Sequence, residues 1–112
     1  MTRESFIKRE RLRKRQEFQK VMRCGERKRV GSYLTIFWLK GSCRIGRLGI
    51  IASRKIGGAV IRNFCKRRIR EIFRRNKDKI KPNLDVVVIS GRGISDLPFS
   101  TLEKRIVGIL QA

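Results

Sequence analysis

The 112-residue sequence contains no histidine, and this absence excludes a large part of enzyme chemistry. Without an imidazole there is no Ser-His-Asp or Cys-His set for nucleophilic catalysis. Three cysteines, Cys24, Cys43 and Cys65, are widely spaced with no CxxC pair, whereas a zinc site needs about four ligands at close spacing. The nine acidic residues are scattered and suggest no carboxylate pair. We therefore expect neither a catalytic set nor a metal site in the protein itself.

Long apolar segments are absent too. The longest apolar run, Tyr33 to Leu39, is far shorter than the ~20 residues that span a membrane. The N-terminal sequence MTRESFIKRERLRKR lacks the apolar segment of a signal peptide, and no GxxxxGK[ST] phosphate loop is present. Scattered cysteines of this kind are typical of reduced thiols in the cytosol. We expect a cytoplasmic protein with no membrane association.

Positive charge is the most abundant feature. Thirty lysines and arginines oppose nine acids, which gives a formal net charge of +21, while 40% of the residues are hydrophobic. That hydrophobic fraction predicts one folded domain rather than a disordered tail. The charge predicts a nucleic-acid partner, whose phosphates attract such a surface without regard to sequence. Residues 1–15 form a basic arm in this interpretation, and residues 16–112 form a single RNA-binding domain.

The basic residues concentrate in a strand, turn and helix between Arg47 and Arg75. From Ser53 to Arg75 there are nine basic residues and one acid, Glu71. In a helix over residues 59–76, one face is apolar and carries Ile61, Cys65, Ile69, Ile72 and Phe73. The opposite face carries Lys66, Arg67, Arg70 and Arg74, and like charges four residues apart destabilise a helix unless a polyanion compensates. Arg62 falls in the apolar sector, where function explains a cation better than packing does.

The remaining segments predict an α+β fold with helices packed on a sheet. Helical spacing over Lys14 to Cys24 places Phe18, Val21 and Met22 on one face, and Gly25 ends the helix as a C′ residue. Glu26 to Arg29 is interpreted as a charged connector. Val30 to Lys40 is a strand, and Arg44 to Ser53 is its antiparallel hairpin partner.

The C-terminal part adds a strand and a helix. Leu84 to Ser90 is a near-continuous apolar run, typical of a buried and often parallel strand. Ser100 to Glu103 has the spacing of a capping box that begins the last helix, whose apolar face is Phe99, Leu102, Ile106, Ile109 and Leu110. The predicted order is helix, strands, helix, strand, helix.

The segment RLGIIASRKIGGAVIRNFCKR, which begins at Arg47, closely resembles the signature of the bacterial ribonuclease P protein component. That signature is roughly RxGxxxSKKxGxAVxRNRxKRxxRE. Arg11-Leu12 and Glu17-Phe18 resemble its N-terminal segment, residues 85–89 its last strand and residues 101–103 its final helix.

The resemblance implies a two-layer α/β sandwich of the ribosomal protein S5 domain 2-like type, with a left-handed crossover through the basic helix. It also implies that the protein joins a catalytic RNA, which removes the 5′ leader of precursor tRNA by endonucleolytic hydrolysis. The active site and most of the Mg²⁺ would then belong to the RNA, and no protein partner is required.

The resemblance also assigns candidate RNA-binding residues. Those that would face the catalytic RNA are Arg62, Asn63, Lys66, Arg67 and Arg70, with Arg54 and Lys55 beside them and Arg74 completing the helical row. The family's second arginine of the Arg-Asn-Arg triplet is Phe64 here. We expect Arg68, one turn further on, to replace the missing charge.

The predicted leader-binding cleft has four candidate residues. The resemblance places Phe18 and Ile36 on its walls, and it gives Met22 where the family often has an aromatic residue. Strand alternation puts Trp38 on the same face as Ile36, so Trp38 is either a second stacking ring or part of the core.

Three other functions compete with this interpretation. A basic ribosomal protein or a general RNA chaperone would explain charge and size equally well. The specific spacing of the motif disfavours a ribosomal protein and a general RNA chaperone. The absence of histidines and the absence of paired acids disfavour an autonomous nuclease.

Overall fold

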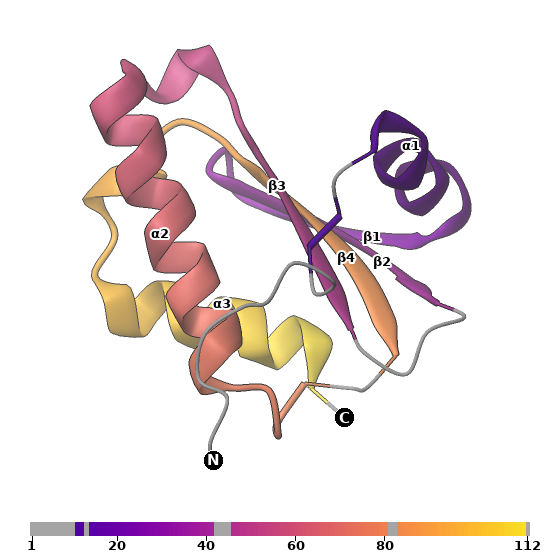
Figure 1. Ribbon diagram of the computed structural model, residues 1–112. Coiled ribbons are helices and arrows are strands. Elements are labelled where there is room, and N and C mark those ends of the chain that lie inside the picture. The colour runs from indigo at the N-terminus through magenta and orange to yellow at the C-terminus, as the bar shows by residue number, and fades with distance from the viewer. Residues whose placement is uncertain (1–10, 13, 42–45, 81–82, 112) are drawn as a thin grey trace.

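The computed structural model describes residues 11–12, 14–41, 46–80 and 83–111 (Figure 1). The helices and strands are, in order, α1 (Arg15–Cys24), β1 (Glu26–Val30), β2 (Leu34–Lys40), β3 (Arg47–Ala52), the 3-10 turn η2 (Arg54–Ile56), α2 (Ala59–Arg75), β4 (Leu84–Ser90), the 3-10 turn η3 (Ile94–Asp96) and α3 (Phe99–Leu110). The predicted order of helices and strands is confirmed. Within the described ranges, no helix combines the length and the apolar character that crossing a membrane requires.

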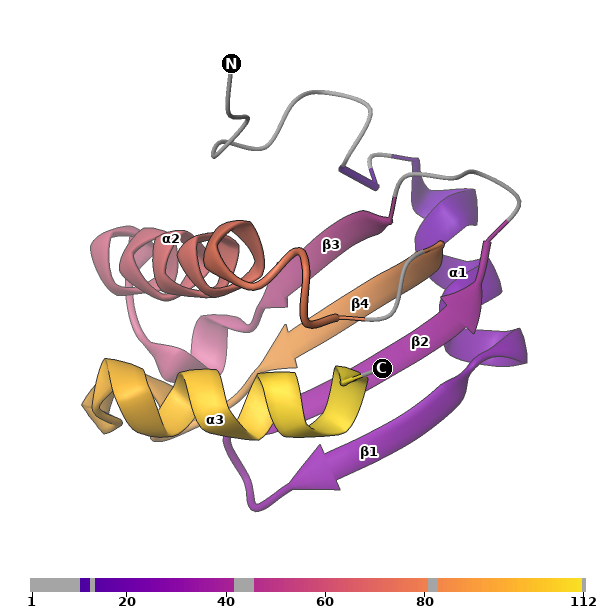
Figure 2. The same cartoon turned by 90° about the horizontal axis from the view of Figure 1, so that it is seen from below.

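The four strands form one sheet in the order β1-β2-β4-β3, with α2 and α3 on one face and α1 on the other (Figures 1 and 2). The β1–β2 and β2–β4 pairs are antiparallel, and the β3–β4 pair is parallel. When α2 is in front and β3 points upward, β4 lies to the left of β3 (Figure 2). The β3–α2–β4 crossover is therefore left-handed, against the usual rule, as the resemblance implied.

Two strand predictions were wrong. The expected connector Glu26–Arg29 belongs to β1, an edge strand in which four of the five residues are exposed. Charged residues are common on edge strands because they discourage pairing with another chain. The predicted hairpin partner of β2, the segment from residue 44 to 53, forms β3 in its described part, but β4 lies between β3 and β2. Residues 42–45 lie outside the described residues.

Each face of the sheet has its own core. The larger cluster lies under α2 and α3 and includes Ile36, Ile69, Val86, Val88 and Ile106. The smaller cluster lies under α1 and contains the buried residues Leu12, Val21, Phe37 and Val87. The predicted apolar face of α2 is buried at Cys65, Ile69, Ile72 and Phe73, whereas Ile61 is 41% exposed.

Gly25 directly follows the last residue of α1, so the predicted end of this helix is confirmed. Its backbone is extended (φ −86°) rather than left-handed, and its N–H donates to the Val21 carbonyl oxygen. A Cβ at this position would lie 2.4 Å from the Trp38 carbonyl oxygen, so close backbone approach explains the glycine. The capping box expected at Ser100 is wrong, because α3 begins at Phe99 after Pro98 and no side chain caps it.

Arg47, at the start of the edge strand β3, joins α1 to that strand and to β4. Its Nε and Nη2 donate to both carboxylate oxygens of Asp85 on β4, at 3.0 and 2.8 Å. Its Nη1 donates to Glu17 Oε2 on α1 at 2.6 Å. Hydrogen bonding to Asp85 is the main cause that raises the pKa of Arg47 well above its ordinary value. This cluster fixes where α1 lies on the sheet.

Candidate RNA interface

The basic segment turns a corner between β3 and α2. At this corner the Ser53 hydroxyl oxygen accepts a hydrogen bond from the Lys55 N–H at 3.1 Å. Gly57 follows with φ +143°, and a Cβ there would lie 2.7 Å from the Ile61 side chain. The corner leaves Arg54 and Lys55 exposed beside the start of α2.

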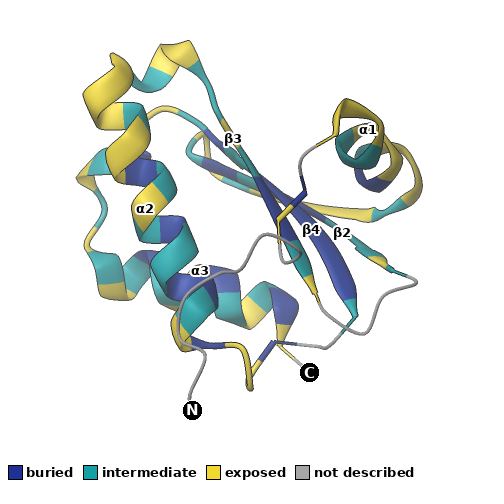
Figure 3. Cartoon of the chain, in the orientation of Figure 1, coloured by how far each residue is buried: buried dark blue, intermediate teal, exposed yellow. Residues whose placement is uncertain are grey.

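The candidate RNA-binding residues are brought together on this corner and on α2. Asn63 and Arg67 are exposed on α2, and the half-buried residues are Arg62, Lys66, Arg68, Arg70 and Arg74. The corner and the first turns of α2 are largely exposed in Figure 3. The corner and α2 therefore present a basic surface beside the sheet.

Arg62 is distinctive within this surface. Its Nε is buried and has no hydrogen-bond partner among the described residues. Buried polar groups in folded proteins are nearly always hydrogen-bonded, so an unpaired guanidinium nitrogen points to a ligand. The prediction that Arg62 lies in the apolar sector of the helix agrees with its partial burial.

A pocket surrounds the outer edge of β3, between the N-terminal segment and α2. Its lining residues are Arg11, Leu12, Phe18, Leu48, Gly49, Ile50 and Arg70. The Leu12 N–H donates to the Leu48 carbonyl oxygen at 3.0 Å, which holds this part of the N-terminal segment against β3. Residues 1–10 and 13 of the predicted arm lie outside the described residues.

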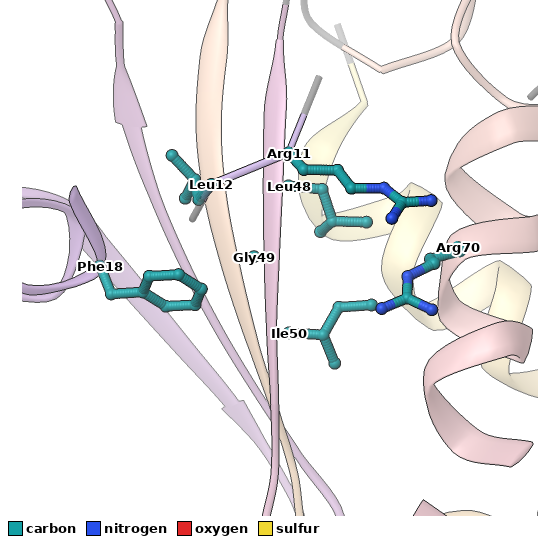
Figure 4. A pocket seen from close by; sticks show the side chains of 7 residues that line it. All are labelled: Arg11, Leu12, Phe18, Leu48, Gly49, Ile50 and Arg70. Atoms are coloured by element: carbon teal, nitrogen blue, oxygen red, sulfur yellow. The ribbon is translucent and has the colours of Figure 1, made fainter. Parts of the chain in front are cut away.

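Arg11 and Arg70 lie on the same side of β3 in this pocket, with their guanidinium ends toward one another (Figure 4). Burial lowers the pKa of Arg70, and the charge of Arg11 lowers it further. Two cations held in this way attract an anion. The sequence prediction included Arg70 but missed Arg11, although the Arg11-Leu12 pair carried a signal: an apolar residue that anchors a cation to the domain.

Phe18 lies on the other side of the β3 edge, over Gly49 (Figure 4). A Cβ at Gly49 would lie 2.5 Å from the Phe18 ring, so the glycine leaves room for the ring on the strand. Phe18 and Met22 both pack against the smaller core cluster under α1. Ile51 on β3 is 36% exposed. Phe18 and Met22 therefore share the α1 face, as predicted for two residues on one side of α1.

The predicted place of Ile36 and Trp38 beside Phe18 was wrong. Both belong to the cluster under α2 and α3, Ile36 with 0% exposure and Trp38 partly buried. Phe18 packs on the opposite face with Phe37 and Val87. Alternation grouped the residues of β2 correctly, but both of its faces are apolar, so the sequence did not determine which face α1 covers.

Arg68 is held by the protein itself. Its Nη2 donates to the Leu97 carbonyl oxygen, and its Cζ lies 5.2 Å from the ring centre of Phe64 and 6.0 Å from that of Phe99. The guanidinium is thus occupied in joining α2 to the segment before α3. This position disfavours Arg68 as a simple replacement for the missing arginine at residue 64.

Arg74 is also occupied, because it forms an ion pair with Glu71 one turn earlier on α2. The hydrogen bond from Arg74 is the main cause that lowers the pKa of the Glu71 carboxyl. The predicted row of Lys66, Arg70 and Arg74 therefore contains residues in different states: Arg70 faces another cation, and Arg74 faces an acid.

Comparison with known proteins identifies the family of the chain. The Ribonuclease P family model matches residues 6–112. The chain belongs to this family. Ribonuclease P protein components from Thermotoga maritima and Fusobacterium nucleatum are 38% and 39% identical to it, over 96% and 83% of this chain and 95% and 86% of those proteins.

Solved structures of ribonuclease P proteins also share the fold. The protein from Thermotoga maritima aligns with a TM-score of 0.81 at 36% identity, over 90% of this chain and 94% of that chain. The protein from Staphylococcus aureus aligns with a TM-score of 0.79 at 28% identity, over 90% and 92%. The ribonuclease P interpretation is therefore favoured over a ribosomal protein or a general RNA chaperone.

Proposed function

We propose that this chain is the protein subunit of ribonuclease P, which binds the catalytic RNA and the 5′ leader of precursor tRNA and promotes endonucleolytic removal of the leader. Arg62 carries the RNA-binding part of the proposal. Its buried Nε has no partner among the described residues, at the centre of a basic surface. A phosphate oxygen of the catalytic RNA would accept that hydrogen bond, and such charge-assisted bonds are among the strongest in proteins.

The basic surface of η2 and α2 supports this binding mode. Exposed Arg54, Lys55, Asn63 and Arg67 lie next to Arg62 and Lys66, on a helix that the core under α2 holds rigidly. Phosphate contacts of this kind release counterions from the RNA, so affinity falls steeply as salt rises. The surface would thus supply attraction and orientation without reading a base sequence.

The pocket at the β3 edge supports a leader-binding role. Single strands are held without strong sequence preference by aromatic rings on which bases stack and by cations that follow the backbone. Phe18 supplies a ring over Gly49, and Arg11 and Arg70 supply adjacent guanidinium groups in the same pocket. We assign one leader base to Phe18 and one leader phosphate to the arginine pair, while Met22 extends the apolar wall.

The chemical step belongs to the RNA in this proposal. The described residues include no group of three or more His, Cys, Asp or Glu side chains that could hold a metal ion. Magnesium, held mainly by the RNA, would activate the attacking water and stabilise the charge that develops on the phosphate. The protein would position the leader, with no further protein partner, in the bacterial cytoplasm.

Leader removal by a bacterial ribonuclease P RNA at low magnesium tests this function. The wild-type protein should accelerate cleavage of precursor tRNA, and Arg62→Met should lose most of that acceleration at protein concentrations that saturate the wild type. Arg105→Met removes the same charge from an exposed position on α3 and serves as the matched control. Equal effects of the two variants would contradict the assigned role of Arg62. Cleavage by the protein without any RNA would instead indicate an autonomous nuclease.

A further inference from the structure

Three large apolar side chains are exposed on the first two turns of α2. Val60 is 81% exposed, Phe64 43% and Ile61 41%. Val60 and Phe64 are four residues apart and Ile61 and Phe64 three, so they form one patch along the helix. This patch lies within the basic RNA-binding surface and interrupts it with an apolar area.

The ring of Phe64 is held in place by a contact with the guanidinium group of Arg68. Arg68 lies over it, and Arg68 is itself held by the Leu97 carbonyl oxygen and by Phe99, whose ring also lies 5.2 Å from Arg75 Cζ. Rings and guanidinium groups thus alternate from α2 to α3. An arrangement of this kind orders the Phe64 ring before any ligand arrives, which lowers the entropic cost of binding to it.

Charge decides what covers the patch. Asn63 directly precedes Phe64, Arg67 lies about one turn after it, and both are exposed. A second copy of this chain, with its own net charge of +21, would be repelled from such a surface. An RNA strand with an unpaired base would fit both the apolar patch and the nearby cation, because the base stacks on the Phe64 ring and its phosphate contacts Arg67.

We propose that Phe64, backed by Arg68, is a stacking platform for one unpaired base of the catalytic RNA, with Arg67 contacting the adjoining phosphate. The family signature has an arginine at this position, so this chain would replace a charge contact with a base contact. The assignment rests on the proposed RNA partner. It also explains why Arg68 is turned toward the ring: it orders the platform.

The test measures affinity of the full-length protein for a bacterial ribonuclease P RNA as a function of salt. Phe64→Leu should weaken binding by at least about fivefold, since one stacked base is worth about 1–3 kcal/mol and 1.4 kcal/mol is tenfold. The slope of log affinity against log salt should stay unchanged, because the ring carries no charge. Phe64→Trp should keep the affinity, and Phe64→Arg should bind with a steeper salt slope.

Phe99→Leu is the matched control. It removes the other ring that contacts Arg68 but leaves the stacking ring of Phe64 in place, so it should weaken RNA binding less than Phe64→Leu does, in protein that remains folded by thermal unfolding. If Phe64→Leu binds like wild type, or if Phe99→Leu loses as much affinity, the stacking platform is overturned. Wild-type self-association that Phe64→Leu abolishes, with RNA affinity unchanged, would assign the patch to a second copy instead. Failure of the wild type to bind the RNA would refute the proposed function itself.

Discussion

Arg47 and Arg62 lie in the same basic segment and are both half-buried, yet their surroundings are opposite. Arg47 donates to two carboxylates, of Asp85 and Glu17, which come from different elements. Arg62 has a buried Nε without a partner among the described residues. The first arginine joins parts of the fold, whereas the second has a donor left for an external group. Arg47 and Arg62 are thus distinguished by whether the guanidinium donors have hydrogen-bond partners within the protein, and not by charge or burial.

The largest expected effect is on stability at Arg47. Arg47→Met should lower the free energy of unfolding by about 2–3 kcal/mol, because it leaves the Asp85 carboxylate largely buried and unpaired. Urea unfolding measures this loss. Arg62→Met should change stability by less than about 0.5 kcal/mol or raise it, since it removes an unpaired donor. A large loss of stability in Arg62→Met would remove the distinction between the two arginines.

The distinction between a structural and an RNA-binding side chain also applies to Trp38 and Phe18, which lie on opposite faces of the sheet. Phe18→Leu should weaken binding of leader-bearing precursor tRNA by about 1–3 kcal/mol while binding of mature tRNA stays the same. Trp38→Leu should instead lower thermal stability and leave the affinities for both precursor and mature tRNA at the wild-type values, because Trp38 packs in the core under α2 and α3. Equilibrium binding to the two RNAs by the holoenzyme separates these outcomes. The reverse result would place the leader on the other face.

A smaller effect is expected at two arginines of α2. Arg70→Gln should reduce the magnitude of the slope of log affinity for leader-bearing precursor tRNA against log salt by up to about 0.7, the value of one phosphate contact on a single strand. Arg74→Gln should reduce it less, because the Glu71 carboxylate already pairs with Arg74. Salt titrations of precursor tRNA binding by the holoenzyme, carried out with both variants, make the comparison. Identical slopes would show that the ion pair opens when RNA binds.

The smallest effect concerns the pH dependence of stability. The pKa of Glu71 is lowered in the folded protein, so its stabilising effect is complete above the ordinary value of 4.5 and is lost as pH falls through the folded-state pKa. Glu71→Gln should therefore be less stable than wild type by a few tenths of a kcal/mol at neutral pH. The difference should vanish at strongly acidic pH. Thermal unfolding across that range checks both parts.

Strong periodicity predicted α2, β4 and the apolar face of α3 from the sequence. It failed for β1, because an edge strand with solvent on most of its surface tolerates a run such as Glu26–Arg29. It also failed for the partner of β3, because neighbours in sequence are usually neighbours in a sheet, and here β4 enters between β2 and β3. Neither failure could be corrected by local pattern alone.

The candidate site was predictable in its charges and less so in its contacts. The cations of η2 and α2 were found because their number exceeds what folding needs. Arg11 was missed because its neighbour Leu12 had to be seen buried against Leu48 before the arm could be placed on β3. The contacts of Arg68 with Leu97 and Phe99 join residues about 30 positions apart, and pairings over such distances follow from the tertiary fold.

The central place of β4 also determines when the protein can fold. β4 bridges β2 and β3, and it is the last strand in the chain. A nascent chain that ends before residue 84 therefore has only the β1–β2 hairpin, which is marginal by itself, and an unpaired β3. The sheet, and with it the support for α2, must wait until β4 has left the ribosome. The basic surface is thus synthesised before it is ordered, among the polyanions that such a chain attracts.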